Sequence, residues 1–160
     1  MEDSKRTVPA LTSLIKRHHK RIGAYLDLSR VTSSEEIKAL CGQHIDLSNR
    51  IIKDLSAWRS AYGEFTKGAD FYFNNDSWYQ LRLIFSFNPE KTNLNRCEEL
   101  EWETLELYKT ATPAMPSAAI SDLQSQEKTI RQMIVEILKV RERRQVVSSL
   151  VTKQLSKSGG

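Results

Sequence analysis

Long apolar runs are missing from this 160-residue sequence. A helix that crosses a bilayer needs about 20 mostly apolar residues, and no stretch of the chain approaches that length. The first residues, Met1 to Arg6, lead into no apolar segment, so no secretory signal is predicted. We therefore expect no membrane span and a cytoplasmic or nuclear location.

Cysteine is also scarce. The two thiols, Cys41 and Cys97, lie far apart and form no Cys-x-x-Cys pair. In a reducing compartment such cysteines are typically small buried side chains, and a disulfide or a reactive thiol is the alternative.

Short catalytic motifs are absent as well. The sequence contains no glycine-rich phosphate loop, no His-Glu-x-x-His, no Gly-x-Ser-x-Gly and no Glu-x-x-His pair. Of the three histidines, His18 and His44 lie on apolar stripes, which is typical of hydrogen-bonded core histidines, and His19 lies among basic residues. We predict a protein that is not an enzyme, with no catalytic residue, no metal ligand and no cofactor. An enzymatic alternative would need a pocket where His18 or His44 meets a carboxylate.

What the sequence does contain is helical periodicity, most clearly between residues 33 and 66. Steps of seven from Ile37 reach His44, Ile51, Trp58 and Phe65, with no proline in between. Thr32-x-x-Glu35 and Ser33-x-x-Glu36 both match capping boxes at the start of this helix. Such a helix would be about 50 Å long, which requires long partners beside it.

A second long helix is predicted over residues 117–156. Steps of seven connect Leu123, Ile130, Ile137, Arg144 and Val151, and the companion positions are Gln126, Met133, Val140, Val147 and Gln154. Arg144 and the two glutamines interrupt this apolar seam. We therefore expect part of the helix to be left uncovered by its own chain and to bind another subunit.

Three shorter helices complete the prediction: residues 9–28, an aromatic-rich helix 77–87 and an acidic helix 95–110. The fold class is all-α, an elongated helical bundle. We expect an N-terminal bundle with an aromatic core over residues 1–111. A proline-containing linker, 112–117, would connect it to the long C-terminal helix 118–156, packed on the bundle or in a coiled coil, and a flexible tail would follow at 157–160.

The function favoured by these patterns is a non-catalytic helical module for protein–protein interaction: a scaffold, an adaptor or an assembly subunit of a larger complex. The partner would be another protein or a second copy, bound through the C-terminal helix. The residues that we expect to make this contact are Ile137, Val140, Arg144, Val147 and Val151.

The alternative is a helical nucleic-acid-binding domain that uses two basic clusters, residues 16–21 and 139–144. Its contacts, which would equally suit an acidic protein, are Lys16, Arg17, Lys20, Arg21, Arg141 and Arg143. The formal net charge of only +4 is too balanced to favour nucleic acid. These cations could instead be solvated, or could pair with the acidic helix of the same chain.

Overall fold

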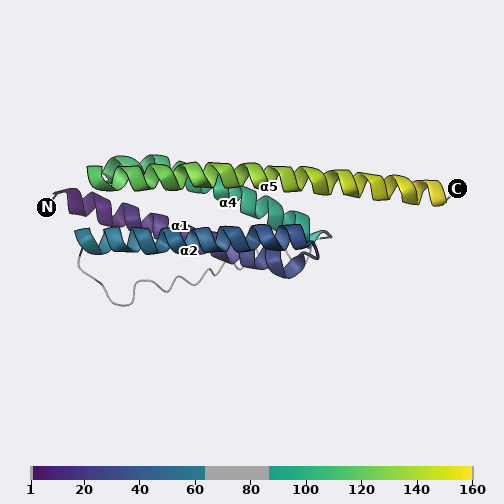
Figure 1. Cartoon of the computed structure of the whole chain (residues 1–160), viewed down its shortest axis with the longest axis horizontal. Coiled ribbons are helices and arrows are strands. Elements are labelled where there is room, and N and C mark those ends of the chain that lie inside the picture. Colours follow the sequence, from purple (N-terminus) through teal and green to yellow (C-terminus); the bar gives the residue numbers. More distant parts are fainter. Residues whose placement is uncertain (1, 64–86, 160) are drawn as a thin grey trace.

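The computed structural model describes residues 2–63 and 87–159, and it confirms the all-α prediction. Four α-helices pack against one another, and the described residues contain no strand (Figure 1). The elements are α1 (Glu2–Val31), α2 (Glu35–Tyr62), α4 (Pro89–Ala111), the short 3₁₀ helix η1 (Thr112–Ala114) and α5 (Ser117–Ser158).

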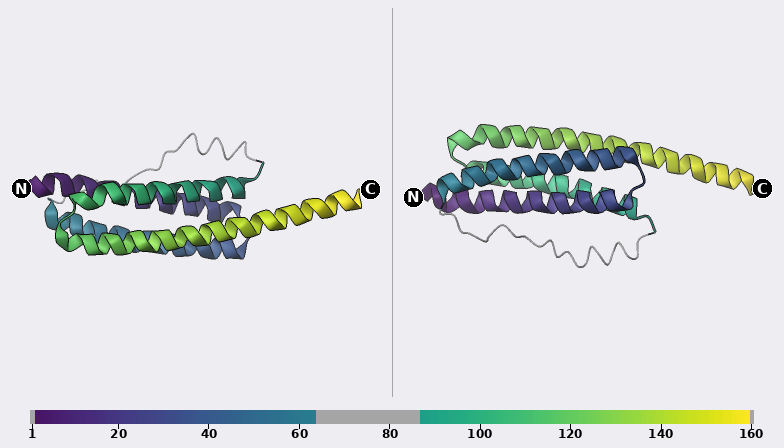
Figure 2. Two further views of the ribbon diagram at one scale, coloured as in Figure 1. Left: turned by 90° about the horizontal axis from the view of Figure 1, so that it is seen from above. Right: turned by 60° about the horizontal axis from the view of Figure 1, so that its bottom comes forward.

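The four helices lie side by side along one long axis (Figure 2). A tight turn makes α1 and α2 an antiparallel pair, and η1 does the same for α4 and α5. Because α2 and α4 run in the same direction, the chain needs a long connection to return from the end of α2 to the start of α4. Residues 64–86 make this connection and lie outside the described residues.

The structure corrects several predicted helix boundaries. α1 begins at Glu2, not near Pro9, because the helix accommodates this proline and continues through it. α2 begins after Ser34, whose side chain accepts a hydrogen bond from the Ile37 amide, and it ends at Tyr62. α4 begins at Pro89, where Asn88 caps the first turn and proline suits the first helical position. The predicted aromatic helix 77–87 falls almost entirely in residues that are not described.

The core divides into two apolar clusters. One lies at the end of the bundle where α4 turns into α5, and the other lies toward the α1–α2 turn. The predicted linker belongs to the first cluster, since Met115 is buried there and Thr7 donates a hydrogen bond of 2.7 Å to the Ala114 carbonyl. The thiols Cys41 and Cys97 are free and buried in the second cluster, as predicted.

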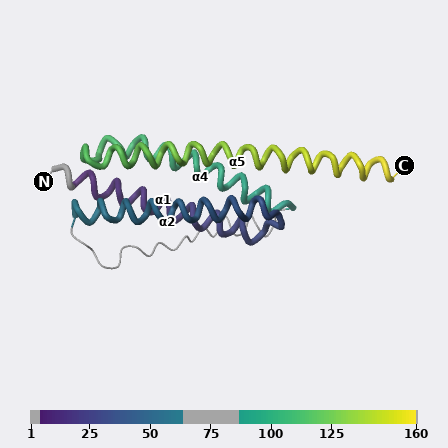
Figure 3. Tube along the Cα trace, in the orientation of Figure 1, coloured from purple at the N-terminus to yellow at the C-terminus, as the bar shows by residue number. Residues whose placement is uncertain are grey.

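The last turns of α5 extend beyond the other helices. Figure 3 shows this segment running past the end of the bundle where α1 turns into α2 and where α4 begins. Val140 is the last buried residue of α5, and every residue from Gln145 to Gly159 is exposed. We call residues 145–158 the α5 tail, and it amounts to about 20 Å of helix.

Candidate functional site

The α5 tail carries apolar side chains that its own chain does not cover. Val147, Val151 and Leu155 recur at four-residue steps and are 51, 51 and 68% exposed. They continue the stripe on which Val140 packs against the bundle, because steps of four, three, four and four connect Val140, Arg144, Val147, Val151 and Leu155. The same face of the helix is therefore buried in the core up to Val140 and exposed to solvent after Arg144.

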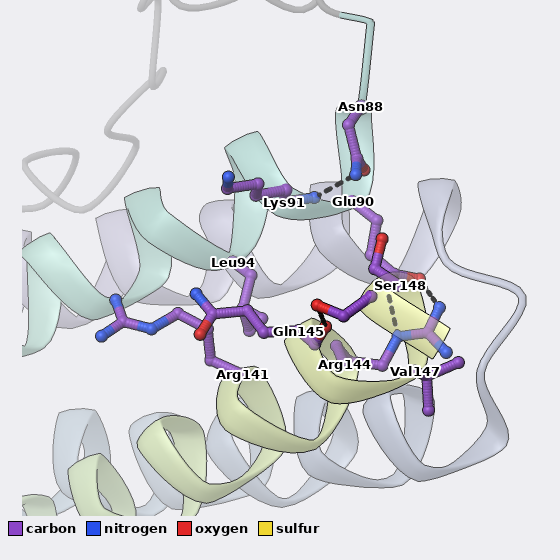
Figure 4. A pocket seen from close by; sticks show the side chains of 10 residues that line it. Asn88, Glu90, Lys91, Leu94, Arg141, Arg144, Gln145, Val147 and Ser148 are labelled. Carbon is purple, nitrogen blue, oxygen red and sulfur yellow. Dashed lines mark hydrogen bonds and ion pairs between the residues drawn. The ribbon is translucent and has the colours of Figure 1, made fainter. Parts of the chain in front are cut away.

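A notch lies at the base of this tail, between α5 and the start of α4 (Figure 4). Its volume is about 660 Å³. Arg144 crosses one side of it and binds Glu90 through two hydrogen bonds of 2.7 and 3.0 Å. Leu94 and Val147 are its apolar lining residues, and the other residues that line it are polar or charged.

The structure divides the five predicted partner contacts into three groups. Ile137 and Val140 are 0 and 2% exposed and pack in the second core cluster, so they face this chain and not a partner. Arg144 is half-buried in its pair with Glu90. Val147 and Val151 lie on the open face of the tail. The prediction treated the whole seam as one surface, because periodicity alone does not show where the neighbouring helices end.

The basic clusters are largely engaged within the chain. Arg17 and Arg141 form ion pairs with Glu103 and Glu98 of α4. Pairing of these cations with the acidic helix of the same chain was one of the alternatives that the sequence left open.

Two further members of the clusters are also bound internally. Arg143 pairs with Glu36 at the start of α2. Arg21 has no solvent exposure, so it cannot present its charge to a ligand at the surface. Lys16 and Lys20 are the predicted contacts that lie on the exposed side of α1.

A layer of buried polar side chains separates the two apolar clusters. At its centre the Arg21 guanidinium binds both carboxylate oxygens of Glu101, with distances of 2.9 to 3.2 Å. Arg21 also donates a hydrogen bond of 2.9 Å to the Ser48 hydroxyl, and the Tyr25 hydroxyl donates one of 2.6 Å to Glu101. These contacts connect α1, α2 and α4 in one plane across the bundle.

A directed chain of hydrogen bonds extends the layer toward α5. Because a guanidinium can only donate, Nδ1 of His18 accepts from Arg21 at 2.9 Å, and its Nε2 carries the proton. Nε2 then donates to the Tyr108 hydroxyl at 2.9 Å, which donates to the Gln126 side-chain carbonyl at 2.9 Å. All four helices thereby contribute to the same network.

His44 completes the layer from α2. Its Nδ1 lies 3.0 Å from the Glu101 carboxylate and must donate to it, which leaves Nε2 as a bare acceptor. This Nε2 is buried and has no hydrogen-bond partner among the described residues. The prediction that His18 and His44 are hydrogen-bonded core histidines is confirmed.

The protonation states follow from burial and from the neighbouring charges. Burial disfavours the charged form of Glu101, but Arg21 and the hydrogen bond from His44 outweigh this and lower its pKa to about 2. Burial lowers the pKa of His18 well below its ordinary value, and the Arg21 cation lowers it further. Burial also lowers the pKa of His44. The layer therefore holds one cation and one anion between two neutral imidazoles.

This constellation meets one condition for acid–base chemistry, a histidine beside a carboxylate, but it lacks access. His18, Arg21, His44 and Glu101 are all without solvent exposure, so a substrate cannot reach them in this conformation. Each side chain also has its orientation fixed by its partners. The arrangement suits a structural role, which is to fix the register of the helices.

Sequence reasoning placed the histidines correctly and missed the ion pair between them. Arg21 was predicted to be a surface contact for an acidic partner, and Glu101 was counted only among the residues of the acidic helix 95–110. The signal that could have found them is the heptad Leu94, Glu101 and Tyr108, which places the glutamate between two residues of the buried face.

Across residues 2–63 and 87–159, no helix combines the length and apolar character that crossing a membrane requires. The same part of the chain contains no group of three or more His, Cys, Asp and Glu side chains positioned to hold a metal ion.

Comparison of the chain with models of protein families, with curated proteins and with solved structures returned no match. Inference about function therefore depends on the geometry of this chain alone.

Proposed function

We propose that this chain is a non-catalytic helical module for protein–protein interaction, working in the cytoplasm or nucleus as a scaffold, adaptor or assembly subunit of a larger complex. The observation that carries the proposal is the open stripe of the α5 tail, where Val147 and Val151 are half-exposed. A helix rarely presents an ordered apolar stripe to water over several turns unless another helix covers it.

The rest of the described molecule supports a binding role through its rigidity. α5 is one continuous helix, and its first part is anchored by the core and by Trp58, whose indole N–H donates a hydrogen bond of 3.0 Å to Asp122. At the base of the tail, ion pairs join Arg143 to Glu36 and Arg144 to Glu90. The tail is therefore held in a defined direction, which reduces the entropy lost when a partner binds.

The experiment compares two double variants that change charge equally on opposite sides of the tail. Val147→Asp/Val151→Asp places two carboxylates on the apolar stripe. Thr152→Asp/Ser156→Asp places two carboxylates, at the same four-residue spacing, on another face of exposed polar residues. Tagged wild-type and variant chains are isolated from cells that make the protein, and bound proteins are quantified by mass spectrometry.

We expect the first variant to lose specific partners and the second to keep them. Each partner is then purified and its affinity for the three forms is measured directly. Loss of binding confined to Val147→Asp/Val151→Asp supports the proposal. A full set of partners that binds all three forms equally would overturn it.

Nucleic-acid binding receives less support. Arg21 is buried, and Arg17, Arg141 and Arg143 already neutralise glutamates of the same chain. Binding to DNA or RNA that weakens steeply with salt and is lost in Lys16→Glu/Lys20→Glu would reverse this judgement.

A further inference from the structure

The occupant of the α5 tail can be inferred from the space around it. We propose that a second copy of this chain binds there, with the two tails packed antiparallel around a two-fold axis near Val151. This inference deepens the proposed function and rests on it, because it names the partner of the same surface.

The first argument concerns direction. The open stripe of the tail continues the face by which α5 packs on its own bundle, so a helix covering it must lie in line with that bundle, beyond its end (Figure 1). If the partner's tail ran parallel to this one, the earlier part of its α5 and its own bundle would occupy the space of α2 and α4. An antiparallel helix approaches from the opposite side and stops where α4 begins. With respect to the described residues, a second copy therefore fits against the tail in the antiparallel orientation and not in the parallel one.

The second argument concerns self-complementarity. A second copy carries the same exposed stripe of Val147, Val151 and Leu155, so each tail can cover the stripe of the other. Isologous two-fold contacts are the commonest form of association between identical chains.

The third argument concerns charge. Helix pairs that select different partners commonly carry charged residues beside the apolar seam. Here the positions that border the stripe are uncharged: Ser148 and Gln154. The lysines of the tail, Lys153 and Lys157, are set away from the stripe by the helical period. A second, identical tail therefore meets no charge repulsion at the seam.

The notch at the base of the tail provides a place for the partner's end. In the antiparallel pair centred on Val151, Leu155 of the second copy lies opposite Val147, which lines the notch together with Leu94 (Figure 4). Leu155 is the most exposed apolar residue of the stripe in the single chain, at 68%. The pairing thus brings the most exposed residue of each stripe to the notch of the other copy.

The overlap is short, which predicts the strength of the dimer. Two helices in contact over about 20 Å bury less than the roughly 1,200–2,000 Å² of a standard stable interface. We therefore expect a reversible dimer that dissociates in the micromolar range, measured by analytical ultracentrifugation over a concentration series.

Val147→Asp/Val151→Asp should weaken this dimer by at least about 100-fold, because each dimer would bury four carboxylates at the seam. Thr152→Asp/Ser156→Asp should dimerise like the wild type. Circular dichroism and thermal unfolding should show both variants folded, since all four positions are exposed. A wild-type chain that remains monomeric throughout the series overturns the inference.

Orientation is tested by disulfide trapping. Val147→Cys and Leu155→Cys chains are oxidised separately and as a mixture. The antiparallel pair predicts a cross-link between the two different chains in the mixture, and none between two Val147→Cys chains, whose new thiols would be about 12 Å apart along the axis. Efficient cross-linking of Val147→Cys with itself contradicts the antiparallel pair.

The two proposals can fail separately. If the chain is monomeric but a different protein binds the tail and is lost in Val147→Asp/Val151→Asp, the second copy is excluded and the interaction function stands. If the chain dimerises through the tail and no other protein depends on that face, the dimer stands and the wider role as an adaptor fails.

Discussion

The Arg21 guanidinium and the Glu101 carboxylate form an ion pair with no solvent exposure, with Nη2 2.9 Å from Oε1. The pair lies between two apolar clusters, at a level of the bundle where each of the four described helices contributes a polar group. Removing two charges from water is costly, so the pair contributes more to the choice of helix register than to net stability. A helix that slipped by one turn would leave one of these charges against apolar side chains.

The first prediction follows from that burial. Glu101→Gln keeps the size of the side chain and removes its charge, so Arg21 becomes an uncompensated buried cation. We expect the free energy of unfolding to fall by about 3–5 kcal/mol, measured by urea denaturation. The matched control is Glu136→Gln, which removes the partner of Lys139 in an exposed pair and should cost less than about 1 kcal/mol. Similar losses in the two variants would contradict a central role for the buried pair.

The second prediction concerns pH. Burial lowers the pKa values of His18 and His44. At acidic pH these two histidines therefore bind protons in the unfolded chain and remain neutral in the folded chain. Stability should therefore be greatest near neutral pH and fall as the pH drops below about 6.5, the ordinary histidine value. Glu101 has its pKa lowered to about 2, so its contribution is present above about 4.5 and is lost as the pH falls from there toward 2.

Unfolding curves at a series of pH values test both steps. His18→Gln removes one of the two histidines and should make the dependence between neutral pH and about pH 5 shallower, although the variant is less stable overall. An unaltered slope in His18→Gln would show that another group is responsible.

The architecture followed from periodicity. The stripe from Ile37 to Leu55 predicted α2, and Ile130 with Ile137 predicted α5, because apolar spacing near 3.6 residues is a property of the chain alone. Helix starts were less predictable, since Pro9 was taken as a first-turn residue and instead lies within α1. Tertiary packing carries α1 through this proline, and local rules do not include that stabilisation.

The buried polar layer was only half predictable. General rules assign charged residues to the surface and large apolar residues to the core. In α4 the structure shows the opposite at two neighbouring positions, with Glu101 buried and Trp102 47% exposed. The exchange depends on a cation from another helix, Arg21, that meets the glutamate in the core. The heptad of α4 indicates that Glu101 lies on the buried face, but which cation it meets depends on how two helices pack.

The third prediction separates the core part of α5 from its tail. Ile137→Ala should lower the free energy of unfolding by about 2–5 kcal/mol, because it opens a cavity between tightly packed side chains. Val151→Ala, on the same stripe but half-exposed, should change the stability of the monomer by less than about 0.5 kcal/mol. Both are measured by urea denaturation at low protein concentration. A large loss for Val151→Ala would mean that the tail is already covered.

The fourth prediction concerns the two thiols. Burial raises the pKa of Cys41 to about 12 and raises the pKa of Cys97 well above its ordinary value. Only the thiolate reacts readily, so both cysteines should be modified slowly by a disulfide reagent in the native protein and at once in denaturant. The time course of absorbance after mixing measures these rates.

An introduced thiol gives the matched control. Thr152→Cys lies on the exposed part of α5 and should react at the rate of a free thiol, while the two native cysteines stay protected. Since modification of Cys97 requires the bundle to open, its rate should rise in Glu101→Gln by the same factor as the equilibrium constant for opening. A native Cys97 that reacts as fast as Thr152→Cys would contradict the packing of α4 against α1 and α2.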